Sequence, residues 1–173
     1  KPFLEISYRG VLATMMEHVR QTLPPEYKSL FVVPEGTNYL HGLPYIQSLD
    51  ILAIPPTSGQ AAAARIALQT LSSVDPVLIL DCDMLLERED LGQLIRYLEI
   101  YDQTVAVTKT FDPNASRVDK VPFPSFFAEK TPISEWGIVG ARGFRHAGAL
   151  SRALDIQGGF VNPTEPYLST AMN

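Results

Sequence analysis

The sequence predicts an α/β fold: a three-layer, Rossmann-like domain in which helices cover both faces of a mixed, mostly parallel sheet. Apolar, strand-like runs alternate along the chain with segments whose apolar residues recur at helical spacing. The runs at 30–33 and 77–80 are apolar without interruption, which is typical of strands covered on both sides. We expect a single domain over residues 1–173, because this length suits one domain and no boundary divides the chain.

Local signals justify each expected element. The apolar residues from Val11 to Val19 recur on one face of a helix, and Pro24-Pro25 ends it because proline cannot continue the hydrogen-bond ladder. The alanine-rich segment 60–71 favours a helix, and Asp90 is expected to cap a helix that reaches Leu98. Strands are expected at 30–33, within 48–54, and at 77–81, 104–108, 126–128 and 138–144, and a short helix at 148–154. Residues 3–6 could be a strand or an extended entry, and segment 111–124 is expected to be a surface excursion.

Composition excludes several classes of function. Lys plus Arg is 14 and Asp plus Glu is 19, so the net charge is −5 and no basic cluster offers a footprint for a nucleic acid. The longest strongly apolar run, 77–80, is far shorter than a membrane helix, so no membrane partner is expected. The single cysteine, Cys82, excludes an internal disulfide framework. These features predict a soluble, cytoplasmic protein.

The strongest chemical signal follows the buried strand at 77–80, where Asp81-Cys82-Asp83 places two carboxylates one residue apart. Ligands of open α/β sheets bind beyond the carboxyl ends of the strands, and alternation puts Asp81 and Asp83 on one side. Carboxylates there can hold Mg²⁺, which takes oxygen ligands and bridges to phosphates. The alternative is that one carboxylate caps a turn and the other is solvated. Cys82 is expected to be buried as a small apolar residue.

Weaker signals lie in three other segments. In 55–64, a turn containing Gly59 leads into an Ala-rich helix, where small residues let a ring or a phosphate approach the backbone; close helix packing would also select them. Glu129-Lys130 could bind sugar hydroxyls and a phosphate, or form an ordinary solvated turn. Glu165 is a lone acid in a proline-rich loop.

Taken in order, these segments resemble the sugar-phosphate nucleotidyltransferases, the pyrophosphorylases that make nucleotide sugars and that have a GT-A-like nucleotide-diphospho-sugar transferase fold. The segments that carry the resemblance are Lys1-Pro2-Phe3-Leu4-Glu5-Ile6, Met15-Met16-Glu17-His18-Val19, Thr57-Ser58-Gly59-Gln60-Ala61, Leu80-Asp81-Cys82-Asp83, Ala128-Glu129-Lys130-Thr131-Pro132, Gly137-Ile138-Val139-Gly140 and Thr164-Glu165-Pro166-Tyr167-Leu168-Ser169. Their shared order and spacing cover nearly the whole chain.

The resemblance implies a role for each matched residue. Lys1 and Asp83 would be the catalytic residues, and Mg²⁺ would be held by Asp83 and Asp81. The implied nucleotide contacts are Lys1, Gly59, Gln60 and Asp81, and the implied sugar 1-phosphate contacts are Glu129, Lys130, Gly140 and Glu165. The implied partners are a nucleoside triphosphate and a sugar 1-phosphate, with a homo-oligomer as a further possibility.

In the implied reaction, a sugar 1-phosphate oxygen attacks the α-phosphorus of the triphosphate and pyrophosphate leaves, in a polysaccharide or surface-glycan pathway. This sequence departs from the family pattern. The opening strand and Gly-rich loop expected before Lys1 are absent, as is the C-terminal end expected after Asn173, and Cys82 replaces a glycine. Two alternatives stay open: a glycosyltransferase that uses Asp81 and Asp83 as its metal pair, and a non-catalytic regulatory module that binds a nucleotide sugar.

Overall fold

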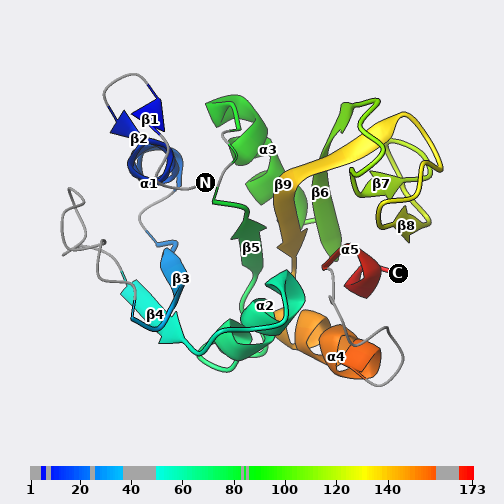
Figure 1. Cartoon of the computed structure of the whole chain (residues 1–173). Helices are drawn as coiled ribbons and strands as arrows, with labels where there is room; N and C mark the ends of the chain where they lie inside the picture. Colours follow the sequence, from blue (N-terminus) through cyan, green and yellow to red (C-terminus); the bar gives the residue numbers. More distant parts are fainter. Residues whose placement is uncertain are drawn as a thin grey trace.

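The computed structural model describes residues 5–6, 9–23, 26–36, 50–82, 84, 86–158 and 168–173 (Figure 1). Their elements follow in the order β1 (Glu5–Ile6), β2 (Arg9–Gly10), α1 (Val11–Thr22), β3 (Leu30–Pro34), β4 (Asp50–Ile54), α2 (Gln60–Leu68), β5 (Val77–Leu80), α3 (Arg88–Leu98), β6 (Gln103–Lys109), β7 (Arg117–Val118), β8 (Phe127–Ala128), β9 (Trp136–Phe144), α4 (Ala147–Gly158) and α5 (Leu168–Ala171). The predicted mixed α/β fold is confirmed.

The strand pairings differ from the predicted sheet. Strands β3 and β4 pair in parallel, but β5 and β6 both pair antiparallel with β9. Because β5 and β6 each oppose β9, they run in the same direction as one another although they are not adjacent. Strand β7 joins β9 at Gly137, and β8 pairs antiparallel with β7. A mostly parallel three-layer sheet is therefore not confirmed, since the reversed strand β9 lies between two strands that would otherwise form a parallel pair.

Side chains of β5 alternate between two apolar clusters. Leu78 and Leu80 pack against the cluster built on α1 and α3, which contains Met15 and Leu91. Val77 and Ile79 pack against the other cluster, built largely from α2, α4 and α5, with Phe144 of β9 and Leu150 among its most buried members. Successive side chains of a strand point to opposite faces, so an uninterrupted apolar run is what a strand covered on both sides requires.

Several element boundaries differ from the predictions. Helix α3 begins at Arg88 after the N-cap Glu87, so Asp90 lies in the first turn, where a negative charge favours the helix terminus, and does not cap it. The predicted surface excursion at 111–124 contains β7, and α5 was not predicted. None of the helices in the described part of the chain is long and apolar enough to cross a membrane.

Candidate functional site

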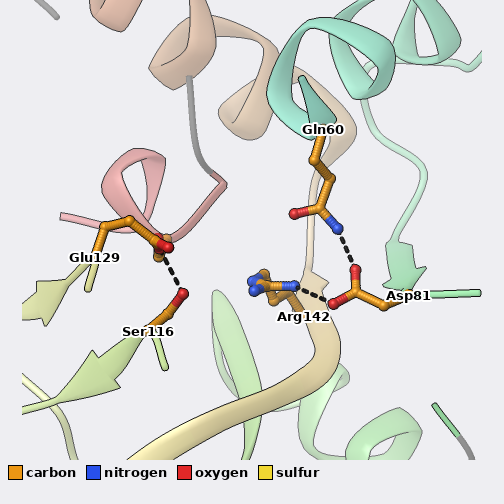
Figure 2. Close-up of polar contacts among 6 residues, drawn as sticks. Gln60, Asp81, Ser116, Glu129 and Arg142 are labelled. Atoms are coloured by element: carbon orange, nitrogen blue, oxygen red, sulfur yellow. Dashed lines mark hydrogen bonds and ion pairs between the residues drawn. The ribbon is translucent and has the colours of Figure 1, made fainter. Parts of the chain in front are cut away.

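The start of α2 lies against the carboxyl end of β5. Asp81 directly follows β5, and Gln60 is the first residue of α2, which is reached from β4 through the turn at 55–59. The side-chain amide of Gln60 donates a hydrogen bond to Oδ1 of Asp81 (Figure 2). The structure therefore brings Gln60 and Asp81, which the sequence placed at one nucleotide site, into direct contact.

Asp81 is held from three directions. Its other oxygen, Oδ2, lies 3.5 Å from Nη1 of Arg142 on β9. Its backbone N–H donates to the carbonyl of Gly140 at 2.6 Å. These contacts come from α2 and β9, so the position of the carboxylate depends on elements that are distant in the sequence. Each carboxylate oxygen has two lone pairs, so Asp81 can still accept a further ligand.

Gly140 allows β9 to approach Asp81. Its φ of +46° lies in the left-handed region that favours glycine. A Cβ at this position would lie 2.5 Å from Cγ of Met84 and 3.2 Å from Cβ of Asp81. The resemblance assigned Gly140 to the wall of a sugar pocket; in the structure its backbone lies directly against Asp81 and Met84.

A second carboxylate is anchored near β7 and β8. Glu129 directly follows β8, and its Oε2 accepts hydrogen bonds of 2.5 Å from the hydroxyls of both Ser116 and Ser169 (Figure 2). Ser169 lies on α5 and is 1% exposed. Because both donors meet Oε2, the lone pairs of Oε1 are not used by these two bonds. Lys130, the next residue, is exposed and has a φ of +50°.

Figure 2 relates the two carboxylates to each other. The guanidinium of Arg142 lies between Asp81 on one side and the Ser116–Glu129 pair on the other in this view. The backbone agrees with the picture, because the N–H of Ile138, which lies on β9 like Arg142, donates to the carbonyl of Ser116. The site is therefore a polar strip along β9.

A cavity of about 680 Å³ lies between β3 and β5. Consecutive residues of both strands line it, which means that strand edges rather than strand faces form its walls. Most of its lining is apolar, but Thr57, Gln60 and Asp81 also line it. The hydrogen-bonded pair Gln60 and Asp81 therefore forms part of the wall of an otherwise mainly apolar cavity.

Several predicted site residues lie outside the described residues. These residues are Lys1, Asp83 and Glu165, so their roles stay predictions. Among the described residues, no group of three His, Cys, Asp or Glu side chains could hold a metal ion. Asp81 supplies one hard oxygen donor, which is the ligand type that Mg²⁺ prefers. The expectation that Cys82 is buried is wrong: it is exposed, because β5 ends at Leu80 and the chain turns there.

Sequence reasoning missed Arg142, Ser116 and Ser169. The two serines carry no local signal, since only the folded chain brings them to Glu129. Arg142 does carry one, because it is the one charged residue in the run Trp136–Phe144, and a charge buried in an apolar strand is more informative than an exposed one. A strand-by-strand search for isolated charges would have found it.

Comparison with solved structures shows that this chain has the fold of nucleotide-sugar pyrophosphorylases and related nucleotidyltransferases. A nucleoside-diphosphate-sugar pyrophosphorylase from Vibrio cholerae RC9 matches with a TM-score of 0.75 and 14% identity, over 100% of this chain and 78% of that chain. A UDP-glucose pyrophosphorylase complexed with UDP-glucose matches with a TM-score of 0.71 and 12% identity, over 99% and 76%.

The similarity extends to a related synthase. The 4-diphosphocytidyl-2C-methyl-D-erythritol synthase from Anaerococcus prevotii matches with a TM-score of 0.70 and 14% identity, over 99% of this chain and 77% of that chain. No protein-family model and no curated protein matches the sequence. At these identities the likeness establishes the fold alone, and the chain spans about three quarters of the structures that it resembles.

Proposed function

We propose that this chain forms nucleotide sugars, by joining a sugar 1-phosphate to a nucleoside triphosphate with release of pyrophosphate. The observation that carries the proposal is the pair of internally anchored carboxylates, Asp81 and Glu129, on either side of Arg142 along β9. The shared fold of the pyrophosphorylases supports it. Internal donors hold both carboxylates in position, and positioned groups are what catalysis by orientation requires.

The reaction needs no nucleophile from the protein. An oxygen of the sugar phosphate attacks the α-phosphorus, a new P–O bond forms, the bond to the β-phosphate oxygen breaks, and pyrophosphate leaves with the electron pair. The chain's own residues would bind and orient the two substrates. Gly59 and Gln60, at the start of α2, would border the nucleotide, and Glu129 with Lys130 would bind the sugar phosphate.

A magnesium ion would fit this chemistry. Asp81, together with Asp83 two residues later, would hold it through carboxylate oxygens. When bound, Mg²⁺ would neutralise charge on the transferring phosphate groups. Lys1 and Glu165 would complete the phosphate and sugar contacts, as the resemblance implies.

The finer features of the proposal follow from the same resemblance. The protein would have a mostly parallel three-layer sheet and would act on a sugar phosphate in the cytoplasm, within a polysaccharide pathway. It would bind a nucleoside triphosphate and a sugar 1-phosphate, and it could assemble as a homo-oligomer.

The test is a pyrophosphate-release assay on the full-length protein. Panels of nucleoside triphosphates and sugar 1-phosphates are combined with Mg²⁺, and the active pair is then used to compare variants. Asp81→Asn should lower kcat/KM by about 100-fold or more, the scale seen when one electrostatic stabiliser of a transition state is removed. Glu129→Gln should raise KM for the sugar phosphate more than KM for the triphosphate.

The matched control is Asp155→Asn. Asp155 is an exposed carboxylate on α4 that pairs with Arg65 at 2.6 Å, away from both clusters, so its removal should leave the activity unchanged. No pyrophosphate from any substrate pair would contradict the proposal. Release of a nucleoside diphosphate from a nucleotide sugar would instead favour a glycosyltransferase, and tight binding of a nucleotide sugar without turnover would favour a regulatory module.

A further inference from the structure

Two arginines are buried in the same sheet, and their surroundings differ. Arg117 on β7 is 3% exposed and Arg142 on β9 is 6% exposed. Arg117 donates to the carbonyls of Thr110 at 2.9 Å, Ser134 at 2.6 Å and Asp112 at 2.6 Å. Its guanidinium therefore ties a loop to the sheet, which is a structural role.

Arg142 is much less satisfied than Arg117. Its contact in the described part of the chain is the 3.5 Å approach of Nη1 to Asp81, which is at the outer limit of a hydrogen bond. Its Nε is buried and has no partner among the described residues, which is also true of the Nε of Arg117, so the two arginines differ in the contacts of their terminal nitrogens. A guanidinium carries five N–H donors, and a buried charge that uses so few of them costs stability. Packing alone does not explain why an arginine occupies this position.

Arg142 also stands where an anion would be useful. Asp81 on one side is already engaged by Gln60, and Glu129 on the other side is engaged by two serine hydroxyls. A ligand whose hydroxyls reach Glu129 would extend along β9 toward Arg142. A guanidinium matches a phosphate through two parallel N–H···O bonds, and this geometry is specific to arginine.

We infer that Arg142 binds the phosphate group of the sugar phosphate, in the stretch of the site between Asp81 and Glu129. The inference rests on the proposed function for the identity of the ligand. It adds a specificity residue that the family resemblance did not include. In the ligand-free protein the weak contact with Asp81 keeps the guanidinium in place, and binding replaces it with a closer anion.

The test follows the Nε–H signals of both arginines in the full-length, ¹⁵N-labelled protein. Arg142→Lys and Arg117→Lys identify the two cross-peaks by their loss. Inorganic phosphate and α-D-glucose 1-phosphate are then titrated separately. We expect the Arg142 signal to shift saturably with both and the Arg117 signal to stay in place. Calorimetry should show that Arg142→Lys binds inorganic phosphate at least about tenfold more weakly than the wild type, as expected for loss of a charge-assisted hydrogen bond.

Thermal unfolding separates binding from structural support. Arg142→Met should keep or raise the melting temperature, because it removes a poorly paired buried charge, whereas Arg117→Met should lower it. The inference is overturned if the Arg142 signal does not respond to either anion. It is also overturned if Arg142→Met loses as much stability as Arg117→Met while Arg142→Lys binds phosphate normally.

The two proposals fail in different ways. If phosphate shifts the Arg142 signal but no substrate pair yields pyrophosphate, the anion site stands and the proposed reaction falls. If pyrophosphate forms at an unchanged rate and KM in Arg142→Met, the proposed reaction stands and the role of Arg142 falls.

Discussion

Replacing Gly140 with alanine tests whether the backbone of β9 must lie against Asp81. Two costs can be worked from the structure. A residue with a Cβ in the left-handed region costs about 1–2 kcal/mol. The added Cβ would also lie 2.5 Å from Cγ of Met84, and overpacking of this kind costs about 1–3 kcal/mol. We therefore expect Gly140→Ala to lower the free energy of unfolding by about 2–5 kcal/mol.

Urea denaturation provides the measurement, with Trp136 as the fluorescence probe, because it is the one tryptophan of the chain and lies on the same strand as Gly140. Gly92→Ala is the matched control. Gly92 lies inside α3, and an added Cβ would meet Nη1 of Arg96 at 3.7 Å, an ordinary contact. Alanine has the higher helix propensity, so Gly92→Ala should stabilise the protein by up to about 1 kcal/mol.

A second substitution separates the two costs. Met84→Ala removes Cγ, the atom nearest the added Cβ, but leaves the Cβ of residue 84 at 2.9 Å and the backbone strain. The double variant should therefore be more stable than the sum of the single effects predicts, by about 1–2 kcal/mol. A Gly140→Ala protein as stable as the wild type, or strictly additive effects with Met84→Ala, would refute the reasoning.

Three further predictions concern other parts of the fold. Ser169→Ala should lower the free energy of unfolding by about 1–2 kcal/mol, because it removes a buried donor to Glu129; unfolding in urea measures it, and an unchanged midpoint would contradict it. The pKa of Asp119 is lowered to about 2, chiefly by the Ser125 side-chain hydrogen bond. Its contribution to stability is thus complete above pH 3.8 and lost as the pH falls toward 2, so the Ser125 amide signal should titrate near pH 2 and not near 3.8. Leu150→Ala, in the core, should cost about 2–5 kcal/mol, whereas Ile156→Ala on the exposed side of the same helix should change stability by less than about 0.5 kcal/mol; equal melting temperatures would contradict the assigned burial.

The elements with strong local signals were predictable from the sequence. Strand β5 was expected at 77–81 and ends at Leu80, and α1 ends at Thr22, just before the paired prolines. Both cases depend on information carried by the segment itself. An uninterrupted apolar run indicates a strand covered on both faces, and proline ends a helix because it has no backbone N–H to donate. The start of α3 was missed by three residues, with the N-cap expected at Asp90 and found at Glu87, because Asp90 also suits a first turn.

The partners of each strand were not predictable in the same way. The sequence of β9 shows that it is apolar, but nothing in it indicates that β9 runs opposite to both β5 and β6. Strand β7 has two residues and exists because it pairs with neighbours on both sides. For the site, Gln60, Asp81 and Glu129 could be proposed from their neighbours in sequence. Their anchoring groups could not, because only tertiary packing brings Ser116 and Ser169 together.

The anchoring of the two carboxylates has a consequence for how the protein reaches its working state. The hydrogen bonds to Asp81 close loops of 21 and 61 residues, and those to Glu129 close loops of 13 and 40 residues. Contacts between distant residues form late, because the entropy of loop closure must first be overcome. Tertiary contacts alone therefore assemble the two anchored carboxylates, and a chain with intact helices but without these contacts would lack both of them.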